Sequence, residues 1–161
     1  MDLGIQGRSA IVCASSRGLG RGCAMSLAQN GVNVVINGRD EAVTTATADE
    51  IRAASDVDVT PVIADVSTKE GQAALLAACP QPDILVNNNG GPPFRDFREL
   101  TREDMLAGVT MNFATPIELV QAVIDPMVAQ GFGRIVNITS VSVMKPVFGL
   151  DLSSGARAGL T

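Results

Sequence analysis

The chain has 161 residues, of which 46% are apolar and 18% are charged, and its formal net charge at pH 7 is -5. This composition is typical of one globular domain with a hydrophobic core and excludes a disordered chain. The negative charge argues against nucleic acid or an anionic membrane surface as a partner, and no apolar run approaches the length of a membrane span.

Five short apolar segments, rich in Val and Ile, alternate with longer segments of mixed polarity. Consecutive apolar residues are typical of strands in a parallel sheet that is covered on both faces. Strands are predicted over Ser9–Cys13, Val32–Asn37, Val57–Ala64, Asp83–Asn87 and Gly133–Thr139. Strands that alternate with helices predict an α/β fold, with an open, doubly wound parallel sheet and helices on both faces.

The intervening segments carry helix start and stop signals. Helices are predicted over Leu19–Asn30, Asp40–Ala54, Ser67–Cys79 and Thr101–Gln130. Gly31 is placed to end the first of these helices. Ser67 with Glu70, and Thr101 with Asp104, have the spacing of a capping box, so Ser67 and Thr101 are the predicted N-caps.

The last predicted helix and the end of the chain are unusual. Pro116 and Pro126 should kink or divide the helix over Thr101–Gln130. Ser153–Thr161 has the pattern of the first turns of a further helix, which the sequence cuts short. We therefore expect residues 1–161 to be a single dinucleotide-binding domain that is truncated or only part of a longer chain.

The cysteines and the start of the chain favour a reducing compartment. The first residues lack a basic segment followed by a long apolar stretch, so we expect no secretion signal and a cytoplasmic location. Cys13, Cys23 and Cys79 are odd in number and have no C-x-x-C spacing. Because the chain also has no His, no metal site is expected. The absence of both His and Tyr removes two of the commonest proton-transfer side chains.

A glycine turn joins the first predicted strand to the first predicted helix. Amide groups at a helix N-terminus bind phosphate, and glycines let the phosphate come close. Gly18 and Gly20 fit this pattern, whereas Ala14 stands where the pattern has its first Gly, a place that Ala can occupy if its φ is negative. A tight turn that needs positive φ explains a glycine pair equally well. The turn residues expected to contact a cofactor are Ala14, Ser16, Arg17, Gly18, Leu19 and Gly20.

The choice of cofactor depends on the end of the second strand. Arg39 lies there, nineteen residues past Gly20. An acid at this place would bind the ribose hydroxyls of NAD(H), whereas a cation suits the 2′-phosphate of NADP(H). Arg17 could supply a second cation, although both arginines could also be solvated surface residues. Beside a phosphate turn the two favour NADP(H) over NAD(H), while Asp40 could instead turn its carboxylate toward the ribose.

Five segments, in order along the whole chain, resemble motifs of the short-chain dehydrogenases/reductases, in particular of the 3-oxoacyl-ACP reductase type. Residues 13–20 (CASSRGLG) resemble the TGxxxGxG turn, and Ala64–Val66 resembles the Asp-Val pair that contacts the adenine. Asn87–Gly90 (NNNG) resembles the NNAG motif. Asn112 matches the helix Asn that anchors a proton-relay water, and Asn137–Ser140 matches the segment that ends at the active-site Ser.

The resemblance implies a Rossmann-type fold whose C-terminal part is missing here. It also implies an NADP(H) cofactor, a small carbonyl or alcohol substrate, and a homodimer or homotetramer. Among the residues beyond the glycine turn, those implied to bind the cofactor are Arg39, Asp65, Val66, Asn88, Asn89 and Gly90.

Two catalytic positions depart from the family's pattern. Thirteen residues after Ser140 the family has a Tyr and four further on a Lys, whereas this chain has Ser153 and Arg157. In the family the Tyr gives a proton to the developing alkoxide, which Ser153 is poorly suited to do, although it could orient a water. Arg157 can still hold the nicotinamide ribose. Asp151 and Lys145 are alternative acids, but ordinary solvated charge is the favoured interpretation of both.

Three functions are compatible with these residues. The favoured one is an NADP(H)-dependent oxidoreductase that reduces a carbonyl, with 3-oxoacyl thioesters as one class, or oxidises the alcohol, using Asn112 and Ser140. The second is a catalytically impaired NADP(H)-binding protein. The third is a protein used mainly for association through Thr101–Gln130 and the helix that starts near Ser153, although association alone needs neither the glycine turn nor Arg39. Apolar residues in two loops suggest an apolar or acyl substrate: Pro92, Pro93, Phe94, Met144, Pro146, Val147 and Phe148.

Overall fold

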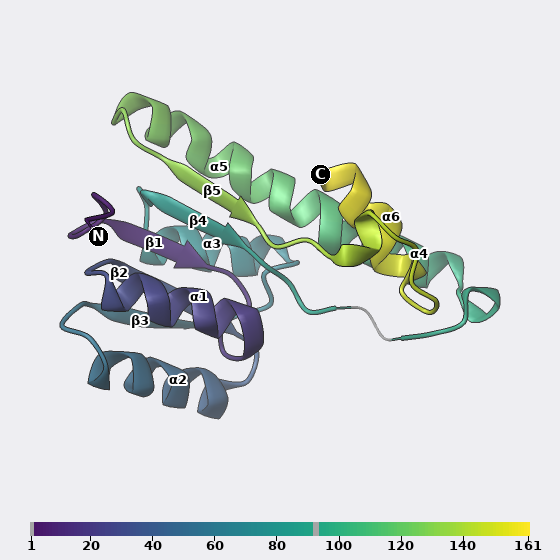
Figure 1. The fold of residues 1–161 in the computed structure, drawn as a ribbon, viewed down its shortest axis with the longest axis horizontal. Coiled ribbons are helices and arrows are strands. Elements are labelled where there is room, and N and C mark those ends of the chain that lie inside the picture. The colour runs from purple at the N-terminus through teal and green to yellow at the C-terminus, as the bar shows by residue number, and fades with distance from the viewer. Residues whose placement is uncertain (1, 92–93) are drawn as a thin grey trace.

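The computed structural model describes residues 2–91 and 94–161, so Pro92 and Pro93, which were predicted to line the pocket, lie outside the described residues. Five parallel strands form one sheet in the order β3-β2-β1-β4-β5 (Figure 1). The strands are β1 (Ser9–Val12), β2 (Asn33–Gly38), β3 (Val59–Ile63), β4 (Ile84–Asn87) and β5 (Arg134–Asn137). This confirms the five predicted strands. Because the strand order reverses between β1 and β4, a ligand crevice is expected at the carboxyl ends of these two strands.

Helices cover both faces of the sheet, as predicted (Figure 1). The helices and shorter turns are α1 (Gly18–Gln29), α2 (Glu41–Ala53), α3 (Lys69–Ala78), η1 (Phe97–Glu99), α4 (Arg102–Val109), η2 (Thr110–Ala114), α5 (Thr115–Ala129), η3 (Val141–Val143) and α6 (Asp151–Leu160). Alternate residues of β1 face opposite sides of the sheet. Val12 packs in the core with Ala24 of α1 and Ile51 of α2, whereas Ile11 packs in a second core with Leu119 of α5.

The helix caps differ from the sequence prediction at one position. Thr101 caps α4 in a full capping box with Asp104, as predicted. α3 is capped by Thr68, whose hydroxyl accepts from the Gly71 amide at 3.0 Å, so the prediction of Ser67 is wrong. Ser67 instead donates its hydroxyl to Asp65 Oδ1 at 2.6 Å. A carboxylate two residues earlier in the chain is a stronger acceptor than a neutral oxygen and competes for the Ser67 side chain.

The predicted helix over residues 101–130 forms three consecutive elements. α4 passes into the π turn η2 and then into α5, with Pro116 in the first turn of α5 and Pro126 inside that helix. Contrary to the sequence expectation, the run Arg102–Ala129 is long and apolar enough to cross a membrane by length and composition. This is weak evidence for a span, because Leu119 and Val123 of α5 are buried against the sheet as in any core helix.

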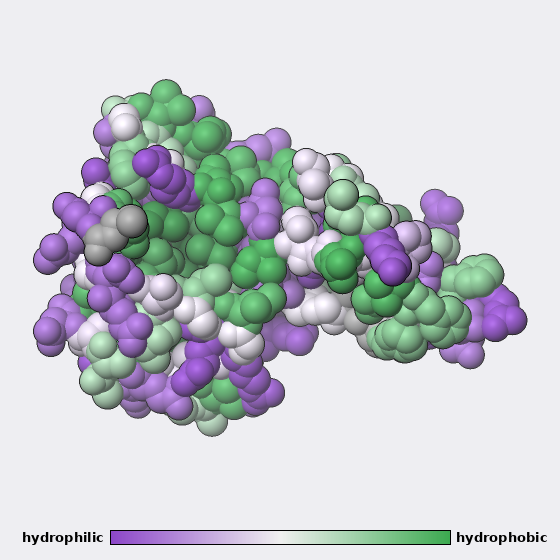
Figure 2. All heavy atoms as spheres, viewed as in Figure 1, coloured by the Kyte–Doolittle hydropathy of each residue, from purple (hydrophilic) through white to green (hydrophobic). Residues whose placement is uncertain are grey.

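In the part of the chain that the structure describes, β5 is an edge strand of the sheet. Apolar side chains gather on the face between α1 and α5, over β4 and β5 (Figure 2). Val136 of β5 is about half exposed there. α6 lies beyond the carboxyl ends of the strands, packed against α4, η2 and η3 (Figure 1).

Candidate functional site

The turn after β1 adopts a left-handed conformation at two residues. Gly18, which begins α1, has φ +57°, and Ala14 has φ +44°. The sequence condition for an Ala at this place, a negative φ, is therefore not met. The cause is tertiary, because hydrogen bonds from residues outside the turn hold Ala14 on both sides. A Cβ crowds the carbonyl oxygen in this region, so Ala14 is strained where a glycine would not be.

The N-terminus of α1 is open to an anion. The N-cap residue Arg17 makes no side-chain cap, and the first turn of α1 contains no acid. Gly20 is buried, and a Cβ on it would lie 2.5 Å from the Ala14 carbonyl oxygen and 2.9 Å from Asn88 Nδ2. Its lack of a side chain lets three chain segments meet there. Amides left unsatisfied at a helix N-terminus, beside glycines, are suited to binding phosphate.

A cavity of about 220 Å³ opens beside this turn, at the carboxyl ends of β1 to β4. It brings together eight of the twelve predicted cofactor-binding residues: Ala14, Ser16, Arg17, Arg39, Asp65, Val66, Asn89 and Gly90. Gly18 lines the adjoining groove between α1 and α2, while Gly20 and Asn88 lie behind the turn. Leu19 is 70% exposed on the surface of α1.

Two exposed arginines stand at this cavity with carboxylates nearby. Arg39 Nη1 lies 3.6 Å from Asp65 Oδ2, and Arg17 Nη2 lies 3.9 Å from Asp40 Oδ2. Hydrogen bonds from Ser67 and the charge of Arg39 hold the pKa of Asp65 below its usual value. Asp40 also caps α2 by accepting from the Val43 amide. Ion pairs between exposed side chains are weak, so both guanidinium groups can turn to a ligand phosphate.

The Cys13 thiol, next to the turn, is not a reactive group. Cys13 is fully buried, and burial raises the pKa of its thiol to about 12. A thiol that remains protonated at neutral pH is a poor nucleophile. Among residues 2–91 and 94–161, no group of His, Cys, Asp or Glu has the arrangement of a metal site.

Asn112 lies in the π turn η2 and is buried. Its Nδ2 donates to the Gly108 carbonyl at 3.2 Å, while its Oδ1 has no hydrogen-bond partner in the described chain. Asn89 Nδ2 donates to the Met111 carbonyl at 3.0 Å and thereby connects the cofactor cavity to η2. π turns in long helices are frequent at functional sites, and Asn112 lies within this one.

Ser140 follows β5 and begins η3. Its Oγ accepts from the Ser142 hydroxyl at 2.9 Å and from the Ser142 amide at 3.2 Å. Ser142 is buried, and sequence reasoning missed its contribution. The only sequence signal was a second serine two residues after Ser140. With two bonds accepted at Oγ, the hydroxyl hydrogen of Ser140 is left to donate to a ligand.

Ser153 and Arg157 lie one turn apart on α6, and both are buried. Arg157 Nη1 donates to the Ile138 carbonyl, which fixes α6 against the segment that leads to Ser140. No carboxylate forms an ion pair with Arg157 within the part of the chain that the structure describes. Burial lowers the pKa of its guanidinium. Asp151 and Lys145 are exposed, as expected of solvated charges.

The two apolar loops meet near α6. Phe94 and Phe148 are in edge-to-face contact, with ring centroids 5.9 Å apart, and the Phe94 ring covers Gly149. Both rings remain about two-thirds exposed, and Met144 is almost fully exposed. These loops therefore present apolar surface next to the elements that carry Ser140 and Ser153.

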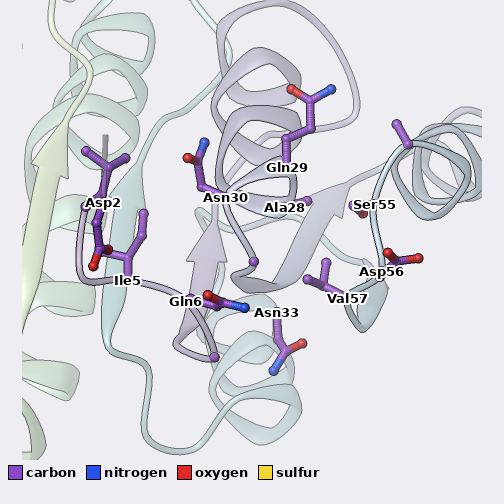
Figure 3. Close-up of a pocket in the computed structure, with 14 residues that line it drawn as sticks. Asp2, Ile5, Gln6, Ala28, Gln29, Asn30, Asn33, Ser55, Asp56 and Val57 are labelled. Carbon is purple, nitrogen blue, oxygen red and sulfur yellow. The ribbon is translucent and has the colours of Figure 1, made fainter.

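A larger cavity, of about 800 Å³, lies at the opposite end of the strands, beside the amino ends of β1 to β3. Figure 3 shows that its lining comes from the chain before β1, the end of α1 and the segment between α2 and β3. None of the predicted site residues lines it.

Comparison with known proteins identifies the family. The family profile described as short chain dehydrogenase matches residues 8–161. The chain is 31% identical to acetoacetyl-CoA reductase of Allochromatium vinosum over 95% of its length, and 34% identical to a (2S)-[(R)-hydroxy(phenyl)methyl]succinyl-CoA dehydrogenase subunit of Thauera aromatica over 98%. It spans 64% of each of these relatives.

A solved structure agrees with this assignment. L-Sorbose reductase from Gluconobacter frateurii, complexed with NADPH and L-sorbose, superposes with a TM-score of 0.93 at 27% identity. The superposition covers 99% of this chain and 62% of the reductase. The family profile matches nearly the whole sequence, and the parallel sheet and the glycine turn are consistent with this match. The chain therefore belongs to the short-chain dehydrogenase family.

Proposed function

We propose that the chain is the cofactor-binding part of an NADP(H)-dependent oxidoreductase that reduces a carbonyl or oxidises the corresponding alcohol. The observation that carries this proposal is the cavity at the carboxyl ends of the strands, which joins an uncapped helix N-terminus to Arg17 and Arg39. The glycine that admits a close approach, Gly20, and the buried polar oxygen at Asn112 fit a polar cofactor that extends from the turn toward η2.

The end of β2 supports NADP(H) rather than NAD(H). A Cβ on Gly38 would lie 2.3 Å from Thr44 Oγ1 and 2.7 Å from Ser16 Oγ, so position 38 has no room for an acidic side chain. The next residue, Arg39, is exposed and cationic. A cation at this place suits a 2′-phosphate, whereas an acid would suit the ribose hydroxyls of NAD(H). The solved structure of L-sorbose reductase, which superposes on this chain, is a complex with NADPH.

When bound at this cavity, NADPH would supply the hydride needed to reduce a carbonyl, and the residues of this chain would hold the substrate and the proton donor. Ser140 donates its hydroxyl hydrogen to the carbonyl oxygen and stabilises the charge that develops there. Ser142 orients Ser140 through the two hydrogen bonds described above. Arg157 holds the ribose next to the nicotinamide through the guanidinium N–H groups that do not donate to the Ile138 carbonyl. Ser153 positions a water that delivers the proton.

Acyl thioesters are the favoured substrate class. Two relatives are named for CoA substrates, acetoacetyl-CoA and a substituted succinyl-CoA. Phe94, Phe148 and Met144 expose apolar surface near α6, which suits an acyl chain. We also infer a homodimer or homotetramer, because α4 exposes Met105 and Leu106 as a pair of apolar side chains. Sedimentation of the full-length protein tests this association.

A catalytically impaired NADP(H)-binding protein is the alternative, and the observation that favours it is Ser153. General acid catalysis typically contributes about 10²–10⁴-fold, and a serine hydroxyl cannot replace a tuned phenol in this role. The cofactor cavity does not depend on Ser153, since no residue of α6 lines it. Binding without turnover is therefore an outcome that the geometry allows.

One experiment separates the two functions. The full-length protein is titrated with NADPH by fluorescence, and NADPH oxidation is then followed with ketones and 3-oxoacyl thioesters. Turnover that is lost in Ser140→Ala supports the oxidoreductase, whereas tight NADPH binding without turnover supports the alternative. The double variant Ser153→Tyr/Arg157→Lys should raise turnover, and no gain at all would show that these positions are wrongly assigned.

A further inference from the structure

The strained residue in the phosphate turn is held from two sides. Ala14 is the one non-glycine residue with positive φ in the part of the chain that the structure describes. Its N–H donates to Asn37 Oδ1 at 3.2 Å, and its carbonyl accepts from Asn88 Nδ2 at 3.1 Å. A left-handed conformation at a residue with a Cβ persists only when its surroundings impose it. The two asparagine side chains are these surroundings.

Asn37 is buried at the carboxyl end of β2, and its side-chain amide is fully used. Its oxygen accepts from Ala14, while its Nδ2 donates to the Ala64 carbonyl at 2.9 Å and to the Val62 carbonyl at 3.2 Å. Only an amide offers one acceptor and two donors in this arrangement. A carboxylate at position 37 would place a second oxygen against the Val62 and Ala64 carbonyl oxygens, which it could not hydrogen-bond. An apolar side chain would leave the Ala14 N–H without its acceptor.

These bonds connect two walls of the cofactor cavity. Ala14 belongs to the wall formed by the glycine turn, and Ala64, with Asp65 and Val66, belongs to the wall after β3. Two hydrogen bonds between Ser15 and the backbone of Asn37 do not involve the Asn37 side chain. The Ser15 amide donates to the Asn37 carbonyl, and the Asn37 amide donates to Ser15 Oγ. Removing the side chain therefore leaves β2 attached to the turn and affects Ala14.

We propose that Asn37 is a positioning residue for the dinucleotide. It imposes the left-handed conformation of Ala14 that directs the turn amides to the phosphates, and it fixes this turn relative to the wall that carries Asp65. Asn37 lines the cavity, but its side-chain oxygen is bound to the Ala14 N–H, so its main effect passes through Ala14. The role of Asn37 in cofactor binding rests on the proposed function, whereas its control of the Ala14 conformation does not.

Rescue by glycine tests this inference. In the full-length protein, Asn37→Ala should weaken NADPH binding about tenfold, which corresponds to about 1.4 kcal/mol. Because glycine adopts positive φ without strain, adding Ala14→Gly should restore most of the lost affinity. Asn33→Ala is the matched control: it lies on the same strand and loses one hydrogen bond, from the Asp58 amide, at the far end of β2. It should leave NADPH affinity unchanged.

Amide hydrogen exchange without cofactor gives a second measurement. Asn37→Ala should raise exchange in the segment 14–18 at least tenfold, and Asn33→Ala should not. Unchanged affinity together with unchanged exchange in Asn37→Ala overturns the proposal. So does an affinity loss that Ala14→Gly fails to restore, because the effect then does not pass through Ala14.

Failure of the proposed function gives a different pattern. If the unmodified protein binds neither NADPH nor NADH, the cofactor assignment is wrong, and the exchange measurement still decides whether Asn37 holds Ala14. If Asn37→Ala does not fold, the double variant with Ala14→Gly is expected to fold, and a double variant that stays unfolded overturns the proposal.

Discussion

Replacing Ala14 with glycine should stabilise the protein, although glycine usually destabilises. Ala14 has φ +44°, and a left-handed conformation costs a residue with a Cβ about 1–2 kcal/mol. Glycine removes this strain but adds about 0.4–1 kcal/mol of conformational entropy to the unfolded chain. The difference predicts that Ala14→Gly raises the free energy of unfolding by about 0.5–1 kcal/mol, which for a chain of this size is a rise of roughly 1–4 °C in Tm.

The assay is equilibrium urea unfolding of Ala14→Gly beside a matched control. Ala74 is exposed in the middle of α3, where Ala→Gly should lower stability by about 1 kcal/mol. The two substitutions are chemically identical, so opposite signs isolate the backbone conformation. A loss of stability in Ala14→Gly equal to that in Ala74→Gly would refute the strain argument.

Three further predictions concern the same cavity. Gly20→Ala should destabilise the protein by about 1–3 kcal/mol and abolish NADPH binding, because the added Cβ would lie 2.5 Å from the Ala14 carbonyl oxygen. Gly22→Ala is the control: position 22 has open space around it, so the added methyl group should stabilise α1. Urea unfolding of the two variants measures the opposite changes in stability. Arg39→Ala should lower the preference for NADPH over NADH about tenfold, measured by comparing the two dissociation constants. The folded-state pKa of Asp65 lies below its ordinary value of 3.8, so its charge stabilises the fold above that pH and the contribution is lost as the pH falls through the lowered pKa. Asp65→Asn should therefore flatten the loss of stability below pH 4, and an unchanged acid-unfolding profile would contradict this.

The sequence by itself determined the architecture. Short runs of Val and Ile between helical segments predict a covered parallel sheet, and the observed strands agree because burial on both faces requires apolar residues at consecutive positions. The cap at Thr101 was also predictable, since both partners of a capping box lie within four residues. Most of the predicted cofactor-binding residues follow strand ends, and parallel strands bring their carboxyl ends together, so the sequence order predicted that these residues would line one cavity.

Only the tertiary structure decided how the turn and the catalytic region are held. The conformation of Ala14 depends on Asn37 and Asn88, which are 23 and 74 residues away, and no local pattern reports such bonds. The orientation of Ser140 by Ser142 and the burial of Arg157 on α6 likewise arise when separate elements pack together. Local sequence encodes helix, strand and cap because their hydrogen bonds join near neighbours. Side-chain bonds between distant segments form only after the sheet has assembled, and they set the geometry of the site.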